Sequence, residues 1–95
     1  MLLRIVKLQF RPSETKAFIE DFESVKAKIR AFDGCHGVRL MRDSAHEDVF
    51  FTISKWQSHI HLEQYRRSEL FRNAWQKTKA RFSERPEAWS LEGVK

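Results

Sequence analysis

The segment SETKAFIEDFESVKAKIRAFDG, residues 13–34, decides the fold because it holds the strongest periodic signal in the 95-residue chain. Its large apolar side chains recur at spacings of four, three, four and three residues, which places them on one face of a helix. They are Phe18, Phe22, Val25, Ile29 and Phe32. Ser13 is a suitable N-cap, and Gly34 can adopt the left-handed conformation that ends a helix. We therefore expect an amphipathic helix that packs on a sheet.

The segment before this helix predicts a strand over residues 2–10. Successive side chains of a strand alternate between its faces, so Val6 and Leu8 lie on one face. Leu3 and Ile5 make the second face partly apolar too. We therefore expect both faces of this strand to be covered.

Residues 36–42 and 48–56 predict a second and a third strand. The polar sequence DSAHED separates them, which favours a hairpin. The third strand is also apolar on both faces, and we expect Phe50 and Trp56 on the same face as Leu3 and Ile5.

The region after the hairpin predicts two helical pieces. Leu62 and Tyr65 begin an apolar stripe, but charged residues occupy positions 69 and 72, where it should continue. The stripe resumes in a new phase at Phe71, and Ser58 and Ser68 are suitable N-caps. We therefore expect a break near residues 67 and 68.

A last strand should contain Trp89 and Leu91, bounded by Pro86 and Gly93. The resulting order β-α-β-β-α-β is the α+β, ferredoxin-like arrangement, an antiparallel four-stranded sheet with its helices on one face. The apolar residues expected on the other face predict that two protomers pack sheet against sheet. The prediction is thus one domain over residues 1–95 that forms a homodimer.

Composition limits the possible partners and compartment. Eighteen Lys and Arg against thirteen Asp and Glu give a net charge of +5, spread along the chain as on a solvated basic surface. Cys35 is the only cysteine, so no intramolecular disulfide can form and a reducing compartment is expected. Arg4 and Lys7 interrupt the N-terminal apolar residues, so neither a signal peptide nor a membrane span is predicted. We expect a cytoplasmic protein that does not bind membranes.

Metal and nucleophile signatures are weak. His59 and His61 are two residues apart, and on a helix such residues point away from each other, so a shared metal ion is not expected. Cys35 and His36 are adjacent, which on a strand places them on opposite faces and argues against an activated thiol.

Nucleic-acid binding is an alternative function, because the ferredoxin-like arrangement also underlies RNA-recognition domains and the second helical region is rich in Arg and Lys. Such domains carry a glycine-aromatic run on the third strand. The sequence DVFFTISKW, residues 48–56, contains no glycine. We therefore expect no nucleic-acid partner.

The aromatic residues around the helix break are the main candidate site. Trp56, Tyr65, Phe71 and Trp75 should converge where the second helical region lies on the sheet. Two interpretations remain open at this point: plain core packing, or the wall of a cavity for a flat aromatic ligand.

The sequences DGCHGV (residues 33–38) and FFTISKWQSHIHLEQYRRSELFRNAW (residues 50–75) resemble the antibiotic biosynthesis monooxygenase superfamily. The shared features are a Gly-Cys turn that opens the second strand, a Trp that closes the third, and two Ser-capped helix starts. The resemblance implies the dimeric α+β barrel fold. Members include oxygenases that need no cofactor and act on polycyclic aromatic or quinol substrates, in which the deprotonated substrate reacts with dioxygen.

By this resemblance, the function is a cofactor-independent monooxygenase acting on a small aromatic or quinone-like compound. The catalytic candidates are Tyr65, Trp75 and Arg66, with Arg66 as stabiliser of a substrate anion. The substrate-binding candidates are Trp56, Phe22, Val25 and Phe71. A non-enzymatic ligand-binding or stress-related protein on the same scaffold is the alternative.

Other members of the superfamily degrade haem, and they use an Asn on the first strand together with a Trp and a His on the second helical region. Here the first strand has no Asn, and Tyr65 and Trp75 stand at the positions that resemble the Trp and the His. The resemblance therefore implies neither a haem nor a metal cofactor.

Overall fold

The computed structural model describes residues 1–94, in which four strands and three α-helices follow the order β-α-β-β-α-α-β. The strands are β1 (Leu2–Gln9), β2 (Cys35–Arg42), β3 (Val49–Trp56) and β4 (Glu87–Glu92). The helices are α1 (Thr15–Arg30), α2 (His59–Arg66) and α3 (Glu69–Lys79), and a short 3-10 helix, η1 (Pro12–Glu14), precedes α1. This confirms the predicted ferredoxin-like α+β fold.

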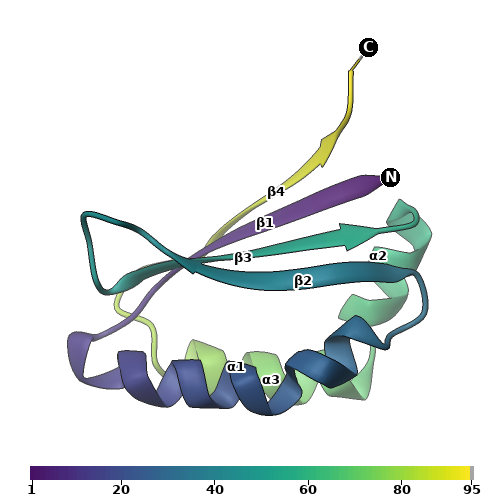
Figure 1. Cartoon of the computed structure of the whole chain (residues 1–95). Helices are drawn as coiled ribbons and strands as arrows, with labels where there is room; N and C mark the ends of the chain where they lie inside the picture. Colours follow the sequence, from purple (N-terminus) through teal and green to yellow (C-terminus); the bar gives the residue numbers. More distant parts are fainter. Residues whose placement is uncertain (95) are drawn as a thin grey trace.

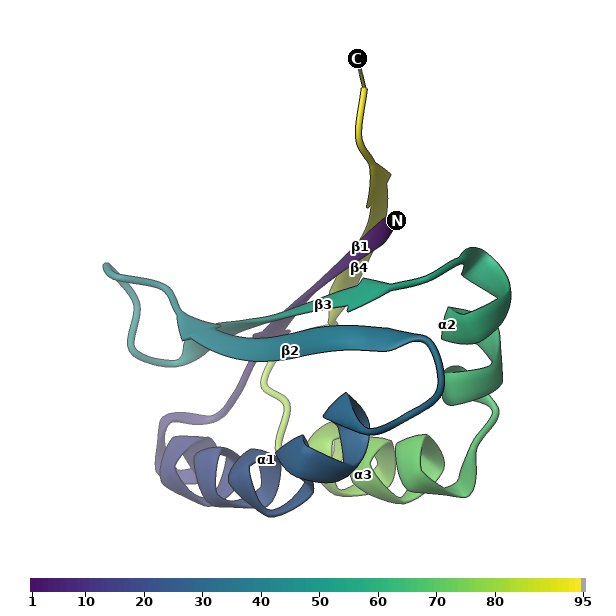
Figure 2. The same ribbon diagram turned by 45° about the vertical axis from the view of Figure 1, so that its right-hand side comes forward.

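The strands form one antiparallel sheet in the order β2-β3-β1-β4. Figures 1 and 2 show α1 and α3 side by side across one face of this sheet, with α2 at one end. The other face carries no helix, and β4 forms an edge beside β1. Within residues 1–94, no helix is long and apolar enough to cross a membrane.

Helix α1 buries the stripe that its spacing predicts. Phe18, Phe22 and Ile29 are buried, and the remaining two stripe residues pack against the core. The predicted N-cap is wrong, because Ser13 lies inside η1 and the residue before α1 makes no side-chain capping bond. Pro12, with its fixed φ angle and missing N–H, starts a 3-10 turn one step earlier.

The predicted break between two helices is confirmed. Ser58 Oγ accepts a hydrogen bond from the backbone N–H of His61 at the start of α2, and Ser68 Oγ accepts one from Phe71 at the start of α3. Each serine satisfies a backbone donor that the first helical turn leaves unpaired. The chain therefore changes direction at Ser68 while the backbone N–H of Phe71, at the start of α3, keeps a hydrogen-bond partner.

The prediction that Phe50 and Trp56 lie on the face without helices is wrong. The register pairs Phe50 with Leu8 and Trp56 with Leu2, and directly paired residues project to the same face. All four side chains are buried between the sheet and the helices. Both faces of β3 carry large apolar residues, so periodicity alone could not decide which set faces inward.

The opposite surface of the sheet, which we call the open face, is nonetheless apolar. The register places Ile5 between Ile53 on β3 and Trp89 on β4. Trp89, Leu91 and Met41 are 42%, 45% and 43% exposed. The apolar residues of the open face are Leu3, Ile5, Met41, Phe51, Ile53, Trp89 and Leu91.

Candidate functional site

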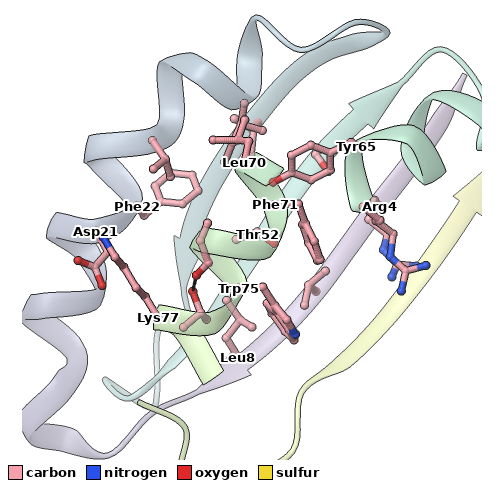
Figure 3. Close-up of a pocket in the computed structure, with 18 of the residues that line it drawn as sticks. Arg4, Leu8, Asp21, Phe22, Thr52, Tyr65, Leu70, Phe71, Trp75 and Lys77 are labelled. Carbon is pink, nitrogen blue, oxygen red and sulfur yellow. Dashed lines mark hydrogen bonds between the residues drawn. The ribbon is translucent and has the colours of Figure 1, made fainter. Parts of the chain in front are cut away.

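A cavity of about 450 Å³ lies between the helix-facing side of the sheet and the helices. Its volume falls within the range of about 300–1,000 Å³ that is usual for small-molecule sites. Figure 3 shows side chains from α1, α2, α3 and the sheet around this space. The residues predicted for the site all line it: Phe22, Val25, Trp56, Tyr65, Arg66, Phe71 and Trp75.

Four aromatic rings form a continuous row along one wall of the cavity. Trp56 stacks on Tyr65 with ring centroids 4.9 Å apart, and Tyr65 meets Phe71 edge-on at 5.2 Å. Phe71 then stacks on Trp75 at 5.8 Å. The change of direction at Ser68 makes this row possible, because it lets residues of α2 and α3 face the same space (Figure 3). The aromatic set is therefore both helix stripe and cavity wall.

Tyr65 presents a protonated hydroxyl group to this site. Burial, with a smaller contribution from the nearby Cys35, raises the pKa of Tyr65 to about 12. At neutral pH the phenol is therefore a hydrogen-bond donor and cannot serve as a base. The hydroxyl group forms no hydrogen bond with any other residue in the described part of the chain. It is free to donate to a bound molecule.

Trp56 contributes its ring and not its polar tip. Its side chain is fully buried, and its Nε1–H donates to Ser54 Oγ at 2.9 Å. Because the indole has a single donor, this bond leaves none for a ligand. Ser54 was not predicted as a site residue, although it lies two positions before Trp56 on the same face of β3.

Arg66 stands at the outer rim of the cavity. It is exposed, and its Nη1 donates to Glu63 Oε1 at 2.9 Å across one turn of α2. Such exposed pairs are weak, so the guanidinium group can turn toward a stronger anion at little cost.

Arg4 also lines the cavity, from β1, and was not predicted as a site residue. The strand alternation could have predicted this position. Arg4 lies two residues before Val6 and four before Leu8, so all three side chains project to the same face of β1.

The two acidic residues in the cavity wall are already paired with cations. Asp21 accepts a hydrogen bond from Arg81 Nε at 3.0 Å, and Glu87 lies 3.8 Å from Lys7 Nζ. Arg81 holds the Asp21 carboxylate, and the register pairs Glu87 with Lys7 on the open face of the sheet, so neither carboxylate is a free general base in the cavity.

Comparison with known proteins identifies the family. The family model described as antibiotic biosynthesis monooxygenase matches residues 1–77, which is most of the chain. The chain belongs to the antibiotic biosynthesis monooxygenase family. No functionally curated protein matches it significantly.

Solved structures share the fold of this chain. A crystal structure of an antibiotic biosynthesis monooxygenase superposes with a TM-score of 0.93 at 18% identity and covers all of both chains. Rv0793 from Mycobacterium tuberculosis gives 0.90 at 18% identity over 99% of this chain and 95% of the other. A conserved protein from Methanosarcina mazei gives 0.92 at 17% identity over 99% and 94%. At these identities the likeness shows the fold alone.

The cysteine and the two histidines considered as reactive or metal-binding groups, Cys35, His59 and His61, do not line the cavity. Cys35 is half-buried, and burial raises the pKa of its thiol, so the reactive thiolate is disfavoured. His59 pairs with Glu92 at 3.1 Å and His61 with Ser58 at 2.8 Å, in different directions. Among residues 1–94, no three His, Cys, Asp or Glu side chains are grouped to hold a metal ion.

Proposed function

We propose that this protein is a cofactor-independent monooxygenase that acts on a small aromatic or quinone-like compound within a cytoplasmic homodimer. The observation that carries the proposal is the cavity of about 450 Å³, lined by the aromatic row and by two arginines. Family membership adds support, since monooxygenase activity is what the family is named for.

The proposed reaction converts a phenol or hydroquinone ring into a quinone. The substrate loses its phenolic proton to solvent, and the electron-rich anion reacts with dioxygen at a ring carbon that bears hydrogen; this hydrogen and one proton from solvent leave in the water that forms. One oxygen atom stays on the ring as a carbonyl group and the other leaves as water. The substrate supplies all four electrons, so the protein needs no redox group.

The protein's part is to bind, orient and favour the anion. The ring lies against Tyr65, Phe71 and Trp75, the protonated Tyr65 hydroxyl donates to a substrate oxygen, and Arg66 stabilises the negative charge. Trp56 supports Tyr65 from behind by stacking.

The test is dioxygen uptake by the purified protein with a series of hydroquinones and hydroxylated polyaromatic compounds. Tyr65→Phe and Arg66→Gln should each lower the rate about a hundredfold to a thousandfold, the usual effect of losing one positioned donor to a developing anion. Arg67→Gln is the matched control, because Arg67 is exposed and absent from the cavity wall. No dioxygen uptake with any compound rejects the enzyme, and no ligand-induced rise in melting temperature rejects the ligand site as well.

A second candidate function is non-enzymatic binding of a small aromatic ligand. It is favoured by the absence of a free base among the residues that line the cavity: no histidine is there, both acids are paired, and Tyr65 stays protonated. Under this alternative the same compounds raise the melting temperature but consume no dioxygen.

The homodimer is proposed from the open face. Monomeric proteins rarely expose apolar patches as continuous as the one around Ile5 and Ile53, and a second copy would cover it. The wild-type chain should sediment as a dimer and Ile53→Glu as a monomer, whereas Glu20→Lys, on the exposed surface of α1, should leave the dimer intact. A monomeric wild-type protein refutes this part of the proposal.

A further inference from the structure

Arg4 is an unusual residue for its position. It lies on β1, a central strand, and projects from the helix-facing side of the sheet. Its neighbours along the strand on that face, Leu2 and Val6, are apolar, and its partners across the strands are the neutral Ser54 and Ser90. Its guanidinium group donates to Ser90 Oγ at 2.9 Å, and no carboxylate in the described part of the chain forms an ion pair with it. Figure 3 shows it at the side of the cavity nearest β4.

A half-buried charge without a counterion is costly, because burial removes water without replacing it by an opposite charge. A second cation increases the cost at Arg4. Burial and then the like charge of Arg66 lower the pKa of Arg4, while Glu63 partly opposes them. Both arginines line the cavity, and Glu63, the carboxylate that influences Arg4, is bonded to Arg66.

The rest of the cavity wall does not supply the missing negative charge. Its charged residues are the cations Arg4, Lys28, Arg66 and Lys77 and the acids Asp21 and Glu87. Both acids are engaged by cations from outside the wall, Arg81 and Lys7. The cavity is therefore apolar along the aromatic row and positive at the end where Arg4 lies.

We propose that Arg4 and Arg66 bind a carboxylate, so that the ligand of this cavity is an aromatic acid. Its ring lies along Tyr65, Phe71 and Trp75, and its carboxylate reaches the two guanidinium groups, whose planar donors suit carboxylate oxygens. The assignment rests on the proposed function for the location of the ring, and it adds the chemical class of the substrate. Arg4 is then a binding residue that fixes the orientation of the ring.

The test compares ligands that differ only in charge. 2-Naphthoate and its neutral isostere 2-naphthamide are titrated into the wild-type protein by calorimetry, with quenching of tryptophan fluorescence as a second signal. The carboxylate should bind at least tenfold more tightly than the amide, because a charge-assisted hydrogen bond is worth more than a neutral one. Raising the salt concentration should weaken the binding of 2-naphthoate and leave the binding of 2-naphthamide unchanged.

Variants assign the effect to the two residues. Arg4→Met and Arg66→Met should each weaken 2-naphthoate binding about tenfold to a hundredfold and leave 2-naphthamide binding within twofold. Arg67→Met is the matched control and should change neither. Circular dichroism and melting temperature verify that each variant folds.

The outcomes separate this inference from the proposed function. Equal affinity for the acid and the amide, or unchanged 2-naphthoate affinity in Arg4→Met, overturns the inference and leaves the monooxygenase proposal standing. Charge-selective binding that depends on both arginines, without any dioxygen uptake, supports the inference and rejects the enzyme. Binding of neither compound overturns the inference, because no ring then occupies the cavity.

Discussion

The titration of Tyr65 is the sharpest prediction of this structure, because Tyr65 is the only tyrosine in the chain. Its pKa is raised from 10.0 to about 12. The shift of two units corresponds to about 3 kcal/mol of preference for the neutral phenol in the folded state. The unfolded chain should ionise near pH 10 and the folded chain near pH 12.

The sign of the effect on stability follows from proton binding. Between the two pKa values the folded state retains a proton that the unfolded state has lost, so raising the pH favours unfolding. The free energy of unfolding should be unaffected by Tyr65 below pH 10 and should fall by up to about 3 kcal/mol by pH 12. The Tyr65→Phe variant should not show this decrease in the free energy of unfolding. Other titrating groups contribute equally to the wild type and the variant, so the difference between them isolates Tyr65.

The assay is the ultraviolet absorbance of tyrosinate, followed against pH in the folded protein and in urea. Circular dichroism at each pH shows whether the chain is still folded. Cys35→Ser is a useful control: since burial is the larger cause, removing the nearby thiolate should lower the midpoint only slightly. A midpoint near pH 10 in protein that is still folded would mean that the Tyr65 hydroxyl is well solvated, and the proposed donor role would lose its basis.

Two further predictions concern stability. Gly34→Ala should lower the free energy of unfolding by about 1–3 kcal/mol in urea titrations, because Gly34 has a φ of +82° and an added Cβ would overlap a side chain of α2. Gly93→Ala is its control, because nothing lies near a Cβ added at Gly93. An equal loss of stability in the two variants would show that the overlap at Gly34 is not the cause. Ser54→Ala should cost about 1–3 kcal/mol by leaving the buried indole N–H of Trp56 unpaired. In a Trp56→Phe background the same substitution should cost much less, and a full cost there would show that the bond is not the cause.

The helix break is the part of the fold that the sequence predicts most directly. A phase change in the apolar stripe and a serine at each helix start are local signals, and Ser58 and Ser68 indeed cap α2 and α3. The local sequence does not decide which face of β3 packs against the helices, because Phe50 and Phe51 are equally apolar and project to opposite faces. Only the register with β1, a non-local property, places Phe50 on the side of the helices.

The same contrast applies to the site. Aromatic residues at helical spacing predicted the row from Tyr65 to Trp75, because the apolar stripe of each helix can be recognised within that helix alone. Arg4 and Ser54 were missed because a polar residue in a strand is usually read as facing solvent. Their meaning comes from what packs opposite them, and that is set by the whole fold.

The end of the family match at residue 77 has a consequence for how relatives should be compared. The cavity wall continues past that boundary through Thr78 and through Pro86, Glu87 and Ala88, at the start of β4. One side of the cavity is thus built from residues beyond the stretch that the family model matches. If the proposed ligand site is correct, differences in ligand choice among members should depend on this stretch, and exchanging residues 78–94 between two members is the direct way to transfer them.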